Sequence, residues 1–333
     1  MKLSNQWAQA TVTALRDLTP TVREIEFTLV EGSAQVHAPG AHLQVQVLLG
    51  QGDVAKVAKV DIRSYSLIGE PDGRAYRIAV KRLDEGRGGS LAMWRLAVGD
   101  RLQVSEPQNF FSLDMSAPGY LVIAGGIGIT PLVLMAQRLQ AITAKTGVPL
   151  RMLYGARSVE ELAYLPLLRE VLGTALSIFV GASAMGFDSE IAALPPGAQL
   201  YTCGPAPMLE AIKRAWHAAK RPLADLRFET FGSSGRYPTQ SFQLKLPRHG
   251  LDITIPAHVS VLEALEAAGL PCLSNCRRGE CGLCAMDIVA IDGEIDHRDV
   301  FLSDTEKQAK QRLCVCVSRA VGCLTLDSAY RPD

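Results

Sequence analysis

Three cysteines lie within nine residues of the sequence, in the stretch CRRGECGLC from Cys276 to Cys284. Their spacing is C-x4-C-x2-C, and seven of the chain's eight cysteines fall at or beyond Cys272. The N-terminal stretch MKLSNQWAQA lacks the apolar segment and cleavage site of a signal peptide, so we expect a cytoplasmic protein. Clustered thiols in a reducing compartment usually bind metal or do redox work. The spacing therefore predicts a metal-binding loop.

Zinc and iron–sulfur are the two alternatives for this loop. Zinc sites usually pair two C-x2-C-like arms, whereas here three thiols lie on one loop and the fourth must come from a distant segment. That arrangement is the plant-type [2Fe–2S] pattern, C-x4-C-x2-C…C. Gly279 and Gly282 would allow the backbone to curl around a cluster and direct N–H groups at its sulfurs. We therefore predict an iron–sulfur cluster bound by Cys276, Cys281 and Cys284.

The fourth ligand is not fixed by spacing alone, because Cys314 and Cys316 are both suitably placed. The segment resembles plant-type ferredoxins, in which the last ligand opens the closing strand. The stretch CVSRAVGCLTLD, which begins at Cys316, has the pattern of such a strand. The resemblance thus implies Cys316 as the ligand and Cys314 as a neighbour, with Cys272 and Cys323 as packing residues.

A second group of residues that could do chemistry is the glycine-rich stretch AGGIGITP, Ala124 to Pro131. It follows the apolar run YLVIA, and glycines at such a turn let the backbone approach a pyrophosphate. The third glycine of the dinucleotide fingerprint is replaced by Pro131, so this turn alone is a weak signal. The stretch YTCGPAPML contains a second Gly-Pro turn after another strand, and two such turns at the ends of parallel strands define a ligand crevice.

A third group lies nearer the N-terminus, in RSYSL (Arg63 to Leu67) and AVKRLDEGRGGS (Ala79 to Ser90). An arginine and two serines on one strand, facing a glycine loop that ends in serine, are suited to binding a phosphate. Taken alone, the same residues also fit a solvated edge strand and an ordinary hairpin. Both interpretations remain open on these residues.

Three domains are needed to position these groups. Residues 1–113 show short strand-like runs separated by turns, as in an antiparallel Greek-key β-barrel. Residues 114–231 alternate strands and helices, which predicts an α/β domain with a parallel sheet; its helices are expected from Thr130 and over ELAYLPLLREVL and MLEAIKRAWHAAK. Residues 232–240 are expected to be a linker. Residues 241–333 predict an α+β β-grasp ferredoxin domain, with a capping box from Ser260 to Glu263 opening its helix.

Composition excludes some classes of partner. Lys plus Arg equals Asp plus Glu at 34 each, so nothing favours nucleic acid or an anionic membrane as a partner. Met115 to Gln137 is free of charge, but its glycines and proline fit a buried strand, a turn and a helix better than a membrane span.

Together the motifs resemble one known family. Arg-x-Tyr-Ser, Gly-Gly-x-Gly-x-Thr-Pro and Cys-Gly-Pro, in this order, are the pattern of the ferredoxin–NADP reductase superfamily. With a C-terminal plant-type ferredoxin domain, the chain resembles the phthalate dioxygenase reductase family, which includes vanillate demethylase reductases. The resemblance implies FMN in the barrel, NADH in the α/β domain and a ferredoxin domain that passes electrons to a Rieske-type oxygenase through a transient contact.

The resemblance also implies site residues, position by position. For the flavin these are Arg63, Tyr65, Ser66, Lys81, Gly88, Gly89, Ser90 and Phe231, with Phe228 the less favoured aromatic. For NADH they are Gly125, Gly126, Gly128, Thr130, Cys203, Gly204 and Pro205.

The implied chemistry is a relay from a two-electron donor to a one-electron acceptor, with a flavin between them. Such a relay needs no general acid or base, so His37, His42 and His297 are not expected to be catalytic; Thr130, Cys203 and Phe231 would position the rings. FAD in place of FMN, and NADPH in place of NADH through Arg157 and Ser158, remain alternatives. So do a different electron acceptor, a larger redox complex and a zinc-stabilised binding module.

The contact with the oxygenase is expected at the rim of the cysteine loop, where Arg277, Arg278 and Glu280 lie in the sequence. Electron-transfer contacts are usually small and transient. If these charges form the contact, reversing both arginines to glutamate slows oxygenase reduction and leaves NADH oxidation unchanged.

Overall fold

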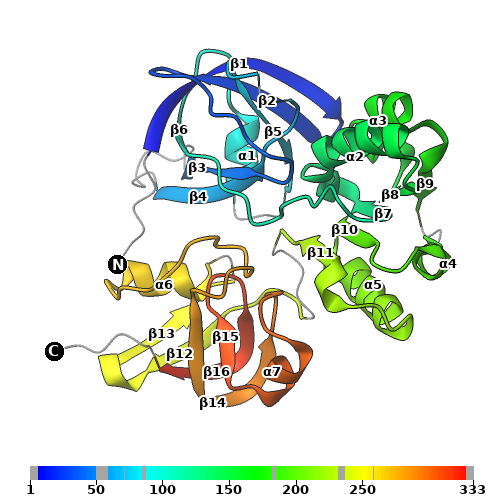
Figure 1. Ribbon diagram of the computed structural model, residues 1–333. Coiled ribbons are helices and arrows are strands. Elements are labelled where there is room, and N and C mark those ends of the chain that lie inside the picture. The colour runs from blue at the N-terminus through cyan, green and yellow to red at the C-terminus, as the bar shows by residue number, and fades with distance from the viewer. Residues whose placement is uncertain are drawn as a thin grey trace. The chain divides into compact units, whose positions relative to one another are not determined.

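The computed structural model describes residues 7–49, 59–70, 72–84, 88–181, 185–231, 237–257 and 259–327 (Figure 1). The chain divides into two compact units, Asn5–Glu229 and, with the first four residues, Thr230–Asp333. Each unit is described by itself. Part of the expected linker, residues 232–236, lies outside the described residues.

The first part of the Asn5–Glu229 unit is an antiparallel sheet of six strands in the order β4-β3-β6-β1-β2-β5. Alternate side chains such as Ile25, Phe27, Leu43 and Val45 are fully buried, as expected for strands with one face toward a core. The edge strands β4 and β5 also approach each other, as in a barrel. The strands are β1 (Trp7–Thr19), β2 (Val22–Leu29), β3 (His42–Leu49), β4 (Lys59–Ser66), β5 (Tyr76–Lys81) and β6 (Arg101–Ser105), with the short helix α1 (Gly89–Trp94) packed on β3 and β5.

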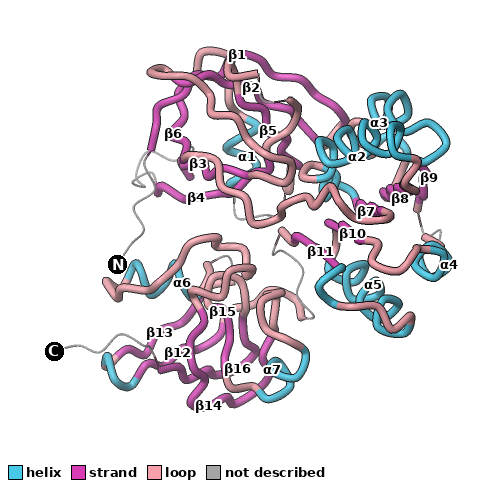
Figure 2. The backbone as a smooth tube through the Cα atoms, in the orientation of Figure 1, coloured by secondary structure: helices cyan, strands magenta, loops and turns pink. Residues whose placement is uncertain are grey.

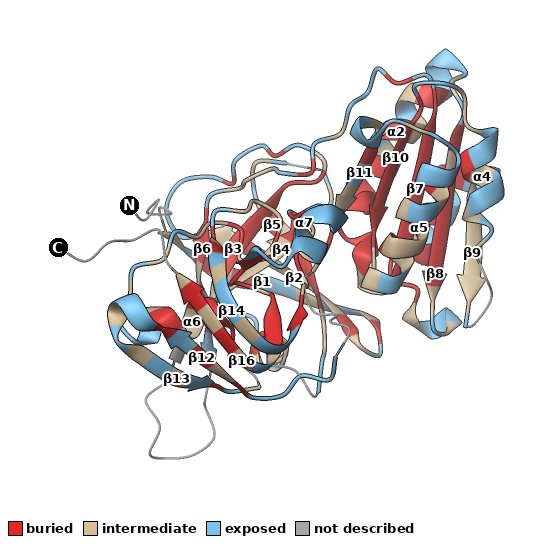
Figure 3. Cartoon of the chain, turned by 90° about the horizontal axis from the view of Figure 1, so that it is seen from below, coloured by how far each residue is buried: buried red, intermediate tan, exposed pale blue. Residues whose placement is uncertain are grey.

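The second part of this unit is a parallel sheet of five strands in the order β11-β10-β7-β8-β9. Its strands are β7 (Tyr120–Gly125), β8 (Leu150–Ala156), β9 (Leu176–Val180), β10 (Gln199–Cys203) and β11 (Leu226–Glu229). Strands β7 and β10 are buried along their whole length, as their apolar sequences predict (Figure 3). The helices are α2 (Leu132–Thr146), α3 (Leu165–Leu172), α4 (Phe187–Ala193) and α5 (Ala206–Ala218).

Two of the helices that connect the strands of this sheet begin at other residues than the sequence predicted. Helix α2 begins at Leu132 rather than Thr130, because residues Gly126–Ile129 form a 3-10 turn first. The helix expected over ELAYLPLLREVL is broken, because Tyr164 has a left-handed φ of 61° that no α-helix accommodates. A 3-10 turn at Val159–Glu161 therefore precedes α3. Helix α4 was not predicted.

The Thr230–Asp333 unit is built on a mixed sheet in the order β13-β12-β16-β14-β15. Its strands are β12 (Phe242–Leu246), β13 (Leu251–Ile255), β14 (Ala285–Asp296), β15 (Arg312–Cys314) and β16 (Arg319–Asp327). Helix α6 (Val261–Ala267) opens with the predicted capping box between Ser260 and Glu263, and a second, unpredicted box opens α7 (Asp304–Ala309). The predicted fold class, with a barrel, an α/β domain and a ferredoxin domain, is confirmed.

The cysteine-rich stretch between α6 and β14 is neither helix nor strand in the described residues (Figure 2). The closing strand β16 begins at Arg319, so Cys316 lies in the turn before it rather than at its first position. None of the helices in the described ranges is long and apolar enough to cross a membrane.

Candidate functional site

The cysteine loop directs its own backbone at one sulfur. Cys276 Sγ accepts hydrogen bonds from the backbone N–H groups of Arg278, Glu280 and Cys281, each at 3.4 Å. Gly279 allows this curl because its φ is +77°, and a Cβ there would lie 2.6 Å from Val317 Cγ2. N–H groups aimed at sulfur are an established feature of iron–sulfur sites and tune their reduction potentials. The loop therefore has the backbone geometry that a cluster ligand needs.

The other cysteines lie around this loop. Cys284 Sγ and Cys316 Sγ are 3.1 Å apart, and both residues are buried. Hydrogen bonds with Cys314 and then Cys316 lower the pKa of Cys284, and the same contacts raise the pKa of Cys314 and of Cys316. Electrostatic interactions also link Cys316 to Cys276 and Cys281 to Cys284. The structure thus brings Cys276 to Cys281, and Cys284 to Cys316, with Cys314 beside Cys284.

These residues fit a [2Fe–2S] cluster by donor type, burial and backbone N–H supply. All eight cysteines are free thiols, so none is held in a disulfide. No group of three or more His, Cys, Asp or Glu side chains within the described ranges is arranged to hold a single metal ion. The fit is that of two pairs of thiols, one within the loop and one that joins the loop to a distant turn, as a cluster of two irons needs.

A hydrogen-bonded segment that sequence reasoning left unassigned supports the loop from outside. The N–H groups of Val300 and Phe301 donate to Gly279 O at 3.0 and 3.1 Å. Just before them, the buried Asp299 accepts hydrogen bonds from Ser318 Oγ at 2.9 Å and Leu302 N–H at 3.0 Å. Burial acts to raise the pKa of Asp299, but its hydrogen bonds outweigh burial and hold that pKa below its usual range. The charged stretch DHRD at 296–299, which ends in Asp299, is the sequence feature that could have pointed to this support.

The charged side chains of the cysteine loop are less exposed to solvent than the sequence led us to expect. Arg278 is 7% exposed and its guanidinium pairs with Glu280 at 2.9 Å. Glu280 also accepts the backbone N–H of Thr230 at 3.1 Å, and Arg277 pairs with Glu266. The expectation of a charged, solvated rim is therefore wrong for Arg278 and Glu280, because internal ion pairs hold both side chains.

The exposed side chains next to the cysteine loop are apolar instead. Leu273 is 55% exposed, and Leu283 and Phe301 are each 46% exposed. The Phe301 ring lies against the loop, since a Cβ at Gly282 would lie 2.2 Å from its Cζ. Sequence reasoning missed this apolar rim because isolated exposed apolar residues carry no sequence signal.

The two glycine turns of the α/β sheet meet each other. Strands β7 and β10 are parallel neighbours, with Cys203 opposite Ala124. A Cβ at Gly128 would lie 2.2 Å from Cys203 O, and a Cβ at Gly204 would lie 3.0 Å from Gly125 Cα. Only glycine permits backbones this close. The predicted turn residues therefore form a single site at the carboxyl ends of two adjacent strands.

The site formed by the two turns also has unfilled space beside Gly126 and a buried hydroxyl, that of Thr202, without a hydrogen-bond partner among the described residues. Gly126 has a left-handed φ of +54°, and a Cβ there would meet nothing within 4 Å. Thr202 Oγ1 is buried and has no hydrogen-bond partner among the described residues. Thr130 Oγ1, in contrast, donates to Ile127 O at 3.1 Å and so holds the turn. These features fit the pyrophosphate and ring of a dinucleotide.

In the barrel, the structure brings the predicted arginine and glycine loop together. Arg63, on β4, lies against Gly89, where a Cβ would lie 2.9 Å from Arg63 Nε. Arg63 is also paired with Asp61. Gly88 precedes α1 with a left-handed φ of +85°, and Ser90 Oγ accepts Leu83 N–H at 3.1 Å. Gly89, at the start of α1, thus lies directly beside the arginine.

The two other barrel residues on β4 also fit a bound group. Ser66 is 4% exposed, and its Oγ has no hydrogen-bond partner in the described part of the chain. Burial raises the pKa of Tyr65, so its hydroxyl stays protonated at neutral pH. The unsatisfied buried hydroxyl of Ser66 follows Tyr65 on the strand that carries Arg63, which fits a flavin phosphate and ring.

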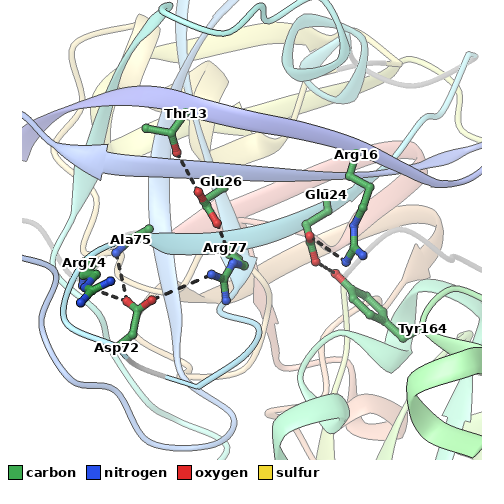
Figure 4. A network of polar contacts seen from close by, with 9 residues as sticks. All are labelled: Thr13, Arg16, Glu24, Glu26, Asp72, Arg74, Ala75, Arg77 and Tyr164. Carbon is green, nitrogen blue, oxygen red and sulfur yellow. Dashed lines mark hydrogen bonds and ion pairs between the residues drawn. The ribbon is translucent and has the colours of Figure 1, made fainter. Parts of the chain in front are cut away.

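Lys81 has a partner that the sequence did not reveal. Its Nζ lies 2.7 Å from Glu161 Oε2, and Thr21 Oγ1 donates to the same carboxylate. The hydrogen bond from Lys81 is the main cause that lowers the pKa of Glu161. A second contact of this kind joins Tyr164 Oη to Glu24 at 2.7 Å (Figure 4). These pairs join the barrel to the parallel sheet within one unit.

The aromatic residue assigned to the flavin ring lies outside the strand expected for it. Strand β11 ends at Glu229, two residues before Phe231, and Thr230 begins the other compact unit. Phe228 lies on β11 with Lys213 Nζ 4.8 Å from its ring centre. The role of Phe231 at a flavin therefore stays a prediction.

Comparison with known proteins agrees with this arrangement. A 2Fe-2S iron-sulfur cluster binding domain matches residues 246–321. The chain is 34% identical to the heme-dependent oxidative N-demethylase beta subunit of Ectopseudomonas mendocina (strain ymp), over 93% of this chain and 95% of the relative. It is 40% identical to the phenoxybenzoate dioxygenase subunit beta of Ectopseudomonas oleovorans, over 80% and 82%.

A solved structure of phthalate dioxygenase reductase is similar with a TM-score of 0.76 and 31% identity, covering 97% of this chain and 98% of that one. It is described as a modular structure for electron transfer from pyridine nucleotides to [2Fe-2S]. The fold and the cysteine site thus define an iron–sulfur oxidoreductase with a nucleotide-binding module. The chain belongs to the phthalate dioxygenase reductase family, the reductase components of multicomponent oxygenase systems. The predicted family and electron-transfer function are confirmed.

Proposed function

We propose that the chain takes electrons from NADH, passes them through FMN to a [2Fe–2S] cluster and delivers them singly to a Rieske-type oxygenase. The observation that carries this proposal is the convergence of Cys276, Cys281, Cys284 and Cys316 in one unit. The other unit brings two glycine turns together for a dinucleotide. A cytoplasmic location, where thiols stay reduced, belongs to the same proposal.

In this relay the flavin, when bound, supplies the conversion between two-electron and one-electron chemistry. The chain's own residues bind the dinucleotide and the flavin and orient their rings. Gly125, Gly126 and Gly204 admit the dinucleotide at the carboxyl ends of β7 and β10, where a neighbouring helix begins. Arg63 and the Gly88–Ser90 loop hold the flavin phosphate by charge-assisted hydrogen bonds. No side chain has to move a proton.

The four thiolates hold the cluster, and the backbone N–H groups on Cys276 stabilise its charge. Plant-type clusters lie near about −400 mV and Rieske centres at roughly −150 mV or above. A gap of about 250 mV favours forward transfer by some four orders of magnitude, at about 59 mV per tenfold for one electron. Transfer from this cluster to a Rieske centre is therefore downhill.

A haem-containing acceptor is the second candidate. The relative from Ectopseudomonas mendocina is named as a subunit of a heme-dependent demethylase, so relatives over nearly the whole chain serve more than one kind of system. Reduction of a purified Rieske protein and of a haem oxygenase, compared at equal concentration, separates the two.

We place the contact with the acceptor on the apolar rim formed by Leu273, Leu283 and Phe301, rather than on the arginines. These side chains are exposed next to the cluster ligands, whereas Arg278 is buried in an internal ion pair. Short-lived electron-transfer contacts are small. Three exposed apolar side chains would therefore make up a large part of such a contact area.

The experiment that tests the function is an anaerobic titration of the holoprotein with NADH, followed by absorption and low-temperature EPR. We expect flavin bleaching together with a rhombic [2Fe–2S] signal. Flavin bleaching without a cluster signal would overturn the relay. Chromatography of the released flavin identifies FMN or FAD, and a parallel titration with NADPH tests the choice of NADH.

A further inference from the structure

A fifth cysteine lies inside the cluster region. Cys314 is fully buried at the end of β15, directly opposite Ala285 in the ladder between β14 and β15. Ala285 follows the cluster ligand Cys284 in the chain. The register of the sheet therefore places the backbone of Cys314 next to the residue that follows this ligand.

The sulfur contacts agree with this register. The thiol of Cys314 hydrogen-bonds with that of Cys284, and Cys316 Sγ lies 3.1 Å from the same Cys284 sulfur. Val315, between the two, donates its N–H to Cys284 O at 3.3 Å. Cys314 and Cys316 thus flank one ligand sulfur, one from the end of a strand and the other from the following turn.

We propose that Cys314 is a reserve fourth ligand, which binds the iron in place of Cys316 when the Cys316 thiolate is lost. This inference rests on the proposed cluster and on Cys316 as its ordinary ligand. In the exchange the Fe–S bond to Cys316 breaks and an Fe–S bond to Cys314 forms. Cys314 gives up its proton and the Cys316 sulfur takes one up, so the charge of the site and the oxidation state of the iron are unchanged.

Only a short segment has to adjust for this exchange. Val317 and Ser318 donate their N–H groups to Cys314 O at 3.2 and 3.0 Å, which confines the turn to four residues after β15. The strand ladder itself remains in place, because Cys314 already lies next to Cys284. The remaining cysteines are less suited: Cys323 is on β16, opposite Asp292 and Gln243 in the ladders, and Cys272 is only partly buried.

The test uses the full-length protein, reconstituted anaerobically with iron and sulfide. The variants are Cys316→Ala, Cys314→Ala, the double variant of both, and Cys272→Ala combined with Cys316→Ala as the matched control. Readouts are iron and sulfide per chain, visible circular dichroism and the EPR g-values of the dithionite-reduced protein. Far-ultraviolet circular dichroism verifies that each variant is folded.

We expect Cys316→Ala to keep at least half of the wild-type iron, with shifted g-values, and the Cys272 control to behave in the same way. The Cys314/Cys316 double variant should lose the cluster at least tenfold, while Cys314→Ala alone keeps it. A folded Cys316→Ala protein without iron overturns the reserve role and leaves the proposed function intact. Loss of the cluster in Cys314→Ala, with Cys316→Ala unchanged, overturns both the reserve role and Cys316 as the ordinary ligand.

Should Cys316→Ala fail to fold, the variant that combines Cys314→Val with Cys316→Val is compared with Cys316→Val alone. Valine fills the space of each thiol and has no atom that can bind iron. Equal iron content in these two variants overturns the proposal, and lower iron in the double variant supports it.

Discussion

The two glycine turns of the parallel sheet and the cysteine loop, which are the two proposed cofactor sites, are built in opposite ways. In the parallel sheet the site is made by backbone: Gly128 and Gly204 allow two turns to touch, and a Cβ at Gly128 would lie 2.2 Å from Cys203 O. In the ferredoxin unit the site is made by side chains: buried thiols and an internal ion pair between Arg278 and Glu280. The first site is sensitive to added volume, and the second to changed chemistry.

The largest expected effect is at the side-chain site. Arg278→Gln removes the guanidinium charge that pairs with the largely buried Glu280 carboxylate, which costs about 3 kcal/mol of unfolding free energy. Urea unfolding of the holoprotein, followed by cluster absorption, measures this loss. Arg312→Gln is the matched control, because its pair with Asp287 is solvent-exposed on both sides and contributes about 0.5 kcal/mol or less.

A second variant of the ferredoxin unit tests the placement of the acceptor contact. Leu283→Ser should leave the unfolding free energy nearly unchanged, because Leu283 is exposed, but slow reduction of the oxygenase. Equal rates of oxygenase reduction in Leu283→Ser and the wild type would show that the contact lies on another surface. NADH oxidation with ferricyanide as acceptor is the internal control, since it does not require the oxygenase.

At the backbone site, Gly128→Ala should force the two turns apart. The added methyl clashes with Cys203 O, and overpacking of this kind costs about 2 kcal/mol. We expect the KM for NADH to rise about tenfold while the cluster EPR signal is unchanged. Gly186→Ala is the control, because its nearest contact, Ser189 Oγ, is 3.6 Å away. Equal KM values for NADH in the two variants would show that the backbone site is not sensitive to added volume.

The smallest expected effect is at the pair between Lys81 and Glu161. The hydrogen bond from Lys81 lowers the pKa of Glu161 in the folded chain below its ordinary value of 4.5. The ionised carboxylate therefore contributes stability above pH 4.5, and that contribution is lost as the pH falls through the lowered pKa. Glu161→Gln should cost about 1 kcal/mol at pH 7 and nothing once the carboxyl is protonated.

Urea unfolding of the apoprotein at several pH values between 7 and 3.5 measures this difference. Glu170→Gln, at an exposed position on α3, is the control and should show no such pH-dependent difference from the wild type. A stability difference for Glu161→Gln that persists unchanged into acid would show that the ion pair is not its cause.

Local signals account for what was predicted of the fold. The strand YLVIA and the capping box at Ser260 are decided by a few neighbouring residues, and the structure contains both of them. The break before α3 was missed because the left-handed Tyr164 is held by a contact across 140 positions, from its hydroxyl to Glu24. Such a contact has no local pattern.

By itself, the sequence determined the class of chemistry. Three thiols on one loop, with a fourth in a distant segment, predict a [2Fe–2S] cluster, because ligand type and spacing are local properties. Only the tertiary structure decided which charges are available and which thiols are neighbours. Arg278 is removed from solvent by Glu280, and Cys314 is brought to Cys284 by the register of β14 and β15. Burial and register depend on residues far apart in the chain, so they appear only when the chain is folded.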